Sequence, residues 1–403
     1  MAISYRDLPV IDLAEPTWWS EPAAVSAPLH EAGAPAAFVP GFDTVMLLRH
    51  EDCLAALGDP RLGAMGARYF EVQGWTDGAF VEWIRLNVVM TDPPGHTRLR
   101  RLVSRAFTPR AVARTAELSQ RVADELCDQV DAADGSVEFV HDWARVMPLR
   151  VVCELIGVPT VDVDTMGTWA AGLTVASGAA GPEAKVAGDE AMEAFNAYVR
   201  EMVARRRQDP GDDLLTALVE AEDEGDRLSE PELVAMVVQL IFAGHETTQN
   251  LIGNAVFRLL EHPDQLAALR ADPDGVPGAV EEALRYDPPI LFTSRLARED
   301  LELAGQPVAA DQLVMLSLAG ANHDPRRFPD PERFDVTRSD VRHLSFGHGT
   351  HFCLGANLAR LEATVALTTL LRRYSSAEEV GTSTWSSYTP LRGRQRLDLR
   401  LTR

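Results

Sequence analysis

One long helical stretch in the second half of the chain restricts the folds that the chain can adopt. Ser229-Glu-Pro-Glu232 predicts the start of this helix, because an N-cap serine and a glutamate three positions later form a capping box. Apolar residues then recur up to Leu260, and His262-Pro263 ends the pattern. Roughly 32 residues at 1.5 Å each give a helix about 48 Å long. We therefore expect it to run through the middle of a domain rather than across a surface.

Polar residues and a glycine interrupt the centre of this helix, in the segment Ala243-Gly-His-Glu-Thr-Thr248. A glycine inside a helix costs about 1 kcal/mol, and Glu246 and Thr247 in an apolar span cost more unless they are hydrogen-bonded. Residues that disfavour a buried helix, in the centre of the longest element, indicate a functional site. A kink relieved by hydrogen bonds from threonine to the helix backbone is the alternative explanation.

A second constraint is the glycine-rich stretch Phe346–Arg360, which contains one cysteine and precedes an apolar helical pattern. Gly347, Gly349 and Gly355 let the backbone turn sharply and approach a bulky group. Cys353 lies just before the predicted helix, whose dipole and N–H groups favour a thiolate over a thiol. The stretch therefore suits a soft, anionic ligand.

The spacing within this stretch follows the pattern Phe-x-x-Gly-x-His/Arg-x-Cys-x-Gly, from Phe346 through His351 to Gly355. It resembles the heme-ligand loop of the cytochrome P450 superfamily, in which the cysteine thiolate is the axial iron ligand. The resemblance implies the cytochrome P450 fold, mainly α with a minor β region, with heme b (iron protoporphyrin IX) between the long central helix and the cysteine loop. It also implies that Cys353 is the metal ligand.

Other segments resemble further motifs of the family. Gly244, Glu246 and Thr247 match the segment over the heme, which implies that Gly244 makes room for dioxygen and that the other two deliver protons. His96 and Arg100 resemble the pair that holds the heme propionates, and Arg295 resembles another propionate ligand. The cofactor-binding set implied by the resemblance is His96, Arg100, Arg295, His351, Phe346, Gly347, Gly355 and Ala243. Glu282, Arg285 and Arg333 resemble a structural triad.

Length and pattern favour a single heme domain over all 403 residues. Its β-rich parts are expected at about 30–60, 290–320 and 375–403, and its α-rich parts at about 90–290 and 354–372. The net charge of −22 argues against nucleic acid as a partner. Without a long apolar run, and with Arg6 and Asp7 near the start, the chain is expected to be cytoplasmic and not bound to a membrane. A monomer is expected.

Electrons are expected from outside the chain, because no second cysteine cluster is present. Arg98, Arg101 and Arg105 follow a spacing that places them on one helix face. This face is either an ordinary solvated surface or a dock for an acidic ferredoxin, which a flavoprotein reductase would reduce.

Three local patterns carry further expectations. Tyr69, Phe70, Trp75 and Trp83 suit a flap over an apolar ligand, although aromatic residues of a core would look the same. The small-residue stretch 176–188 is expected to connect two helices, the second starting at about Asp189. The alternation in Leu397-Asp-Leu-Arg-Leu401 predicts an edge strand.

The favoured activity is insertion of one oxygen atom from O₂ into an apolar organic substrate, by hydroxylation or epoxidation. A terpenoid, steroid, polyketide or fatty acid would suit. A peroxide-driven relative and a non-catalytic heme-binding or sensing protein are alternatives. A hydrolase with Cys353 as nucleophile is disfavoured, because His351 at i, i+2 is poorly placed as its base.

Overall fold

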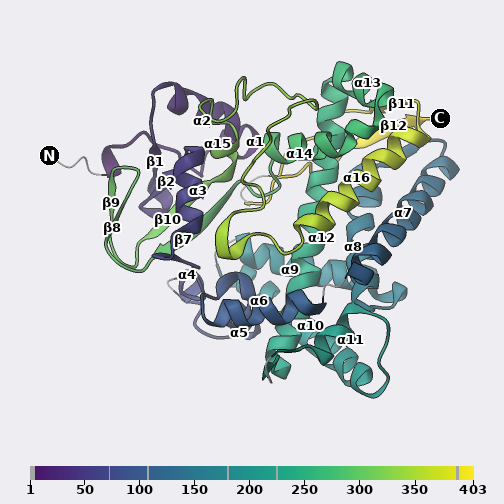
Figure 1. Ribbon diagram of the computed structural model, residues 1–403, viewed down its shortest axis with the longest axis horizontal. Helices are drawn as coiled ribbons and strands as arrows, with labels where there is room; N and C mark the ends of the chain where they lie inside the picture. Colours follow the sequence, from purple (N-terminus) through teal and green to yellow (C-terminus); the bar gives the residue numbers. More distant parts are fainter. Residues whose placement is uncertain (1–4, 72, 107–108, 179–180, 224–225, 387–389) are drawn as a thin grey trace. The chain divides into compact units, whose positions relative to one another are not determined.

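The computed structural model describes residues 5–71, 73–106, 109–178, 181–223, 226–386 and 390–403. Helices predominate and strands form small sheets, which confirms a mainly α fold with a minor β region (Figure 1). The chain divides into two compact units. The first comprises Met1–Gly63, Ala123–Arg145 and Thr247–Arg403, and the second comprises Ala64–Val122 and Val146–Glu246. Two helices, α7 (Pro109–Ala132) and α12 (Glu230–Glu261), contribute residues to both.

A five-stranded sheet forms one core of the first unit. Its order is β1 (Ala36–Val39), β2 (Thr44–Leu47), β10 (Leu313–Ser317), β7 (Phe292–Ala297) and β3 (Leu62–Gly63), and β2 and β10 are its one parallel pair. Val45 and Leu47 face a cluster that includes Cys53 of α3 (His50–Gly58), whereas Met46 faces a cluster with Trp18. Because both faces are covered, β1, β2 and β10 are nearly continuous apolar runs rather than alternating ones.

A three-stranded sheet has the order β11 (Ser376–Glu379), β12 (Asp398–Thr402) and β4 (Ser136–Glu138). The prediction of an edge strand at 397–401 was therefore wrong, because β12 pairs on both sides. Alternation reports only that Leu399 and Leu401 are buried on one face. It contains no information about the second hydrogen-bonding neighbour, which comes from residues far earlier in the chain.

The remaining elements of the first unit are helices, single turns and a hairpin. The hairpin of β8 (Leu301–Leu303) and β9 (Gln306–Val308) turns at Ala304-Gly305, as predicted, with positive φ at both residues. The helices are α1 (Pro16–Ser20), α2 (Pro22–Glu31), α13 (Pro263–Ala271), α14 (Val276–Tyr286), α15 (Leu318–Asn322) and α16 (Ala356–Arg373), with single turns at Tyr5–Asp7, Pro40–Phe42, Val140–Ala144, Pro273–Gly275 and Gly349–His351.

The second unit is helical apart from a short hairpin. Its helices are α4 (Arg68–Glu71), α5 (Ala79–Leu86), α6 (Gly95–Ala106), α8 (Val146–Ile156), α9 (Val163–Gly178), α10 (Pro182–Gln208) and α11 (Leu214–Glu220), with turns at Val88–Met90 and Thr160–Asp162. The hairpin strands are β5 (Glu222–Asp223) and β6 (Asp226–Arg227).

The start and the length of α12 confirm the sequence prediction. The backbone N–H and the hydroxyl of Ser229 both donate to Glu232 Oε2 at 2.8 Å. Leu233 N donates to Ser229 O at 2.8 Å, which closes the first turn. The helix runs for 32 residues and ends at Glu261. No helix in the described ranges is long and apolar enough to cross a membrane.

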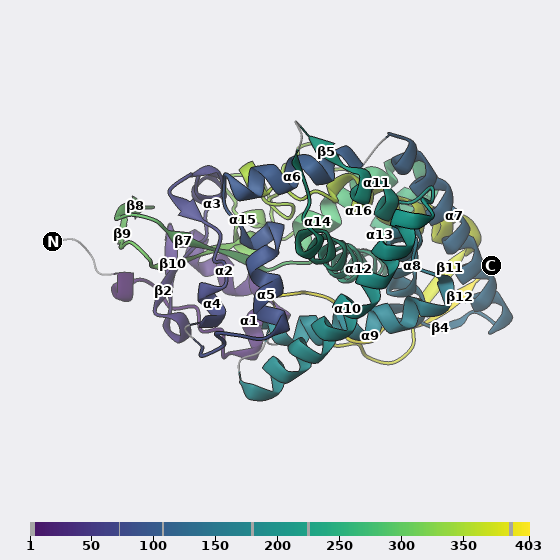
Figure 2. The ribbon, with the colours of Figure 1, turned by 90° about the horizontal axis from the view of Figure 1, so that it is seen from below.

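Ala176 and Gly188, at the two ends of the small-residue stretch, lie at the contact between α9 and α10, which lie side by side (Figure 2). A β-carbon on Gly188 would lie 2.6 Å from Ala176 Cβ, and one on Gly172 would lie 2.9 Å from Ala191 Cβ. Small residues therefore let the two helix backbones approach closely. The expected helix start at about Asp189 was wrong, because α10 begins at Pro182.

The aromatic residues of the second unit belong to its core. Phe70 and Trp75 are stacked with ring centroids 5.7 Å apart, and Phe70 also meets Phe80 edge-on. The indole N–H of Trp83 donates to Ala235 O at 3.2 Å. Phe70, Trp75 and Trp83 are buried, which confirms the alternative of core aromatic residues for these three, whereas Tyr69 is half-buried.

Candidate active site

The cysteine loop lies between residue 346 and the start of α16. Cys353 N donates to Phe346 O at 2.9 Å, and Phe352 N donates to Gly349 O at 3.1 Å. Gly349 has a φ of +70°, and a β-carbon there would lie 2.9 Å from Leu57 O. Only glycine fits this close approach to α3. The loop is therefore folded back on itself and held against a neighbouring helix.

Cys353 differs from the other three cysteines in its exposure. It is partly exposed, whereas Cys53, Cys127 and Cys153 are buried. Burial raises the pKa of Cys153 to about 12. A buried neutral thiol is a poor metal ligand, because the thiolate is the ligating form. Cys353, just ahead of the N-terminus of α16, is therefore the cysteine suited to bind a metal.

Two charged residues that sequence reasoning did not single out stabilise this loop. The guanidinium of Arg360 on α16 lies 4.5 Å from the ring centroid of Phe346. The same guanidinium donates to both carboxylate oxygens of Glu281 on α14, at 2.7 and 3.0 Å. His343 Nε2 lies 3.4 Å from Glu281 Oε2. No local signal reveals this pairing, because its partners are far apart in the sequence.

The structural triad is confirmed for two of its three members. Arg285 and Glu282 are fully buried and form two hydrogen bonds of 2.8 Å. The prediction of Arg333 as the third member was wrong, because its side chain is largely exposed. Only its backbone carbonyl accepts a hydrogen bond from Arg285. Arg338 takes that place, with Nε 3.3 Å from Glu282 Oε2. The sequence did not indicate which of Arg333 and Arg338 places its side chain beside Glu282.

The polar segment of α12 shows three environments. Ala243 is exposed although Ile241 and Leu251 in the same helix are buried. A β-carbon on Gly244 would lie 3.0 Å from Val152 Cγ2 on α8, so packing alone explains that glycine. Thr247 is half-buried.

Glu246 has a partner on another helix of the second unit. Its Oε2 accepts a hydrogen bond from the hydroxyl of Thr174 on α9. Burial raises the pKa of Glu246, and the hydrogen bond from Thr174 lowers it in part. A raised pKa makes a carboxyl a weaker acid, so it holds its proton to a higher pH than an exposed glutamate does. Sequence reasoning missed Thr174, because nothing local distinguishes it from other helical threonines.

His96 and Arg100 lie one turn apart on α6 in the second unit. His96 is buried, and burial followed by the charge of Arg100 lowers its pKa. A neutral imidazole can still donate one hydrogen bond to an anion. Arg98 lies between them in sequence, and its guanidinium bonds Asp226 Oδ2 at 2.6 Å and Glu232 Oε1 at 2.7 Å. Arg98 is therefore already paired with two carboxylates, and a ferredoxin dock on this helix face stays a prediction.

Arg295 lies on β7 in the first unit and is buried. Its guanidinium donates to Thr293 Oγ1 at 3.2 Å and to Ser294 O at 2.9 Å. Within the described residues, no carboxylate lies within 4.0 Å of it, and burial lowers its pKa. A buried cation without a charged partner is costly unless a ligand supplies the anion. This environment suits a propionate group.

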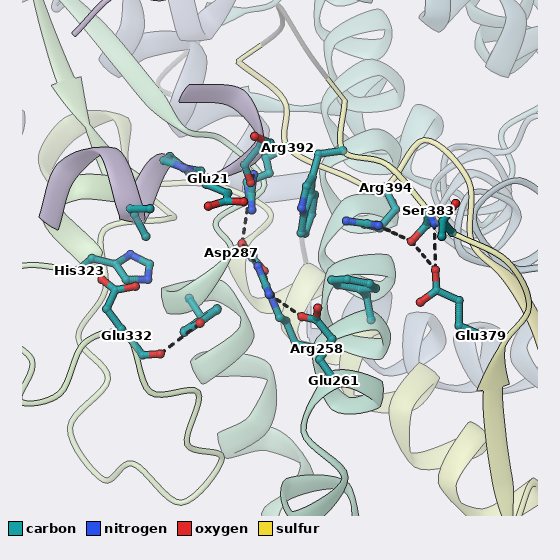
Figure 3. Close-up of a pocket in the computed structure, with 18 of the residues that line it drawn as sticks. Glu21, Arg258, Glu261, Asp287, His323, Glu332, Glu379, Ser383, Arg392 and Arg394 are labelled. Carbon is teal, nitrogen blue, oxygen red and sulfur yellow. Dashed lines mark hydrogen bonds and ion pairs between the residues drawn. The ribbon is translucent and has the colours of Figure 1, made fainter. Parts of the chain in front are cut away.

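A cavity of 570 Å³ in the first unit contains none of these residues (Figure 3). Its central feature is Asp287, which accepts hydrogen bonds from the guanidiniums of Arg258 and Arg392. These two charges lower the pKa of Asp287 below its usual range, although burial alone would raise it. Arg394 is stacked near Trp385, with 4.4 Å to the ring centroid. The cluster joins the ends of α12 and α14 to the C-terminal segment.

Comparison with known proteins identifies the family of this chain. Residues 173–393 match the family model described as Cytochrome P450. Cytochrome P450 107B1 of Saccharopolyspora erythraea is 41% identical over 372 residues, which cover 90% of each chain. The 6-deoxyerythronolide B hydroxylase of the same organism is 39% identical over 373 residues, covering 90% of this chain and 91% of that relative. This chain belongs to the cytochrome P450 family.

A solved structure of a P450 shares the fold. P450BioI in complex with hexadec-9Z-enoic acid ligated acyl carrier protein has a TM-score of 0.89 and 32% identity, covering 95% of this chain and 99% of that one. Members of the family bind heme b, and this P450 is a monooxygenase. Two observations fit this cofactor. Cys353 is accessible, and Arg295 is buried with no carboxylate partner among the described residues.

The predicted site residues belong to two groups. In the first unit, the cysteine loop contains Phe346, Gly347, His351, Cys353 and Gly355, β7 carries Arg295, and α12 carries Thr247. In the second unit, α6 carries His96 and Arg100, and α12 carries Ala243, Gly244 and Glu246. The roles that the family resemblance implies for these residues stay predictions.

Proposed function

We propose that this P450 hydroxylates or epoxidises an apolar organic substrate with O₂, using electrons from an external ferredoxin and its flavoprotein reductase. The single accessible cysteine, Cys353 on a loop that leads into α16, carries the proposal. The name of one relative, a hydroxylase of 6-deoxyerythronolide B, supports insertion of oxygen into the substrate. The fatty acyl ligand of P450BioI supports an apolar substrate.

In this proposal Cys353 holds the heme iron through its thiolate, which the start of α16 stabilises. Arg295, His351, His96 and Arg100 would donate to the propionates, as the family resemblance implies, and Arg295 would thereby gain the anion that its buried position requires. When bound, heme b supplies dioxygen activation, in which one oxygen atom enters the substrate and the other leaves as water.

In this proposal, residues of α12 deliver the protons. Each turnover consumes two electrons and two protons, and bulk water must stay away from the reacting atoms. Glu246 holds a proton on its carboxyl and passes it on, and the hydroxyl of Thr247 relays it. A carboxyl and an alcohol suffice, since each can both donate and accept a proton. This pair favours a true monooxygenase over a peroxide-driven relative or a sensing protein.

Replacement of the proposed ligand tests the assignment. Cys353→Ala is expected to abolish the long-wavelength carbon-monoxide band, since no other described cysteine is accessible. Cys53→Ala, which removes a buried thiol, is the matched control and should keep the band. A Cys353→Ala protein that retains the band of its parent would overturn the proposal. A hydrolase would purify without colour.

The electron donor needs a separate test. Arg98 bonds two carboxylates, and the side chain of Arg105 lies outside the described residues, whereas Arg101 on the same helix is exposed. Arg101→Glu should slow heme reduction by ferredoxin and weaken its dependence on salt. Unchanged stopped-flow kinetics would remove α6 from the docking surface.

A further inference from the structure

The contact between Thr174 and Glu246 joins two helices of the second unit at a titratable group. Thr174 Oγ1 lies within hydrogen-bond distance of two acceptors, Glu246 Oε2 and, at 3.3 Å, its own helix carbonyl at Ala170. Glu246 Oε1 accepts no hydrogen bond from the described residues. The two oxygens of one carboxyl therefore have different surroundings. Oε2 is bonded to Thr174 of α9, and Oε1 is left to exchange a proton.

A hydroxyl is suited to a carboxyl that changes its charge. Thr174 can donate to Oε2 whether Oε2 belongs to the carboxylate or is the carbonyl oxygen of the protonated acid. The bond is stronger to the carboxylate, because a charged acceptor strengthens a hydrogen bond. Thr174 therefore limits the rise in pKa that burial imposes on Glu246, and it does so without adding a charge.

We propose that Thr174 is a positioning residue for proton delivery: it holds Glu246 Oε2, so that Oε1 is the atom that takes up and releases the proton. This inference rests on the proposed role of Glu246. It adds a residue of α9, outside the polar segment of α12, to the parts on which the reaction depends.

The chain offers a matched control on the same helix. Thr168 Oγ1 donates to Asp164 O at 3.0 Å, the same i−4 bond that Thr174 can make to Ala170 O. Thr168 is exposed and bonds no carboxylate within the described residues. Thr168→Val therefore removes a helix-backbone bond of the same kind and should leave Glu246 unchanged. Thr174→Ser keeps the hydroxyl and should rescue what Thr174→Val loses.

The first measurement does not depend on turnover. Infrared titration of the heme-loaded protein, with Glu246→Gln to assign the band, gives the pKa of this carboxyl. Thr174→Val should raise that pKa and lower the acid dissociation constant about tenfold, since a bond to a charged group is lost. Thr174→Ser and Thr168→Val should titrate like the parent. An unchanged titration in Thr174→Val would overturn the proposal and leave Thr174 a structural residue.

The second measurement separates this inference from the role of Glu246 itself. NADPH-driven reduction of O₂ with a surrogate ferredoxin and reductase is followed as the ratio of peroxide to NADPH and as the solvent isotope effect. Glu246→Gln and Thr174→Val should both raise these two quantities, and the double variant should resemble Glu246→Gln. If Glu246→Gln has no effect, the proposed proton role fails. If Glu246→Gln raises both quantities and Thr174→Val does not, the inference about Thr174 fails while the proton role of Glu246 stands.

Discussion

At the scale of single residues, the environment of a charged group decides what it can do. Arg295 and Arg285 are both buried arginines, but Arg285 has Glu282 as its partner whereas Arg295 has only neutral oxygens among the described residues. A buried cation with a carboxylate partner is structural, and one without such a partner suits an anionic ligand. The sequence shows two arginines and does not distinguish them.

Glu281 gives a prediction at this scale. Burial would raise its pKa, but His343 and Arg360 lower it from 4.5 to about 2. A carboxyl with a depressed pKa stabilises the fold above its unfolded pKa, and that contribution is lost as the pH falls through its folded pKa. The stabilisation is at most about 3 kcal/mol.

Chemical unfolding of the parent and Glu281→Gln at several pH values measures this contribution. The parent should be more stable at neutral pH, and the difference should shrink between about pH 4.5 and pH 2. A difference that stays constant over this interval would contradict the assigned ion pairs. Arg333→Gln, which alters an exposed arginine, serves as control.

At the scale of elements, close contacts between helices explain residues that look like flexible connections. Gly188 and Gly172 lie where α9 and α10 approach each other, and a side chain at either would meet an alanine. Gly253 in α12 is also helical, but a β-carbon there would meet no atom within 4 Å. Identical residues in helices therefore have opposite expected effects when replaced.

Gly188→Ala and Gly253→Ala test this difference. Gly253→Ala should stabilise the protein by about 1 kcal/mol, because alanine is the better helix former and space is available. Gly188→Ala should destabilise it by about 1–3 kcal/mol, because overpacking outweighs the gain in helix propensity. Urea unfolding measures both. Equal stabilisation by the two substitutions would show that α9 and α10 are less closely packed than described.

At the scale of the whole molecule, segments that are distant in sequence meet in buried ion clusters. The first unit is assembled from three stretches of chain. Asp287 at the end of α14 accepts from Arg258 of α12 and from Arg392 of the C-terminal segment (Figure 3). Arg392 also donates to Trp19 O at 2.7 Å, which ties in α1. The cluster therefore joins α1, α12, α14 and the C-terminal segment within this unit.

Asp287→Asn should reveal how much this cluster stabilises the fold. It leaves the buried guanidinium of Arg392 without its anion and leaves Arg258 with Glu261 as its carboxylate partner, which is expected to cost about 3–5 kcal/mol. Glu261→Gln removes a more exposed partner of Arg258 and should cost less than about 1 kcal/mol. Thermal unfolding of both variants measures the contrast. Similar small losses would mean that the cavity admits enough water to solvate the arginines.

The sequence by itself determined the features that depend on neighbouring residues. The N-cap at Ser229 and the extent of α12 follow from local hydrogen bonds and apolar periodicity, and the spacing around Cys353 is enough to indicate the family. These features are local, because their partners lie within a few residues or one helix turn.

Only the tertiary structure decided which distant segments meet. It placed Arg338 rather than Arg333 beside Glu282, gave Glu246 a partner in Thr174, and put β12 at the centre of its sheet. Spacing along the chain contains no information about such partners. The physical reason is that a side chain's charge state and packing depend on neighbours that folding brings from elsewhere in the chain.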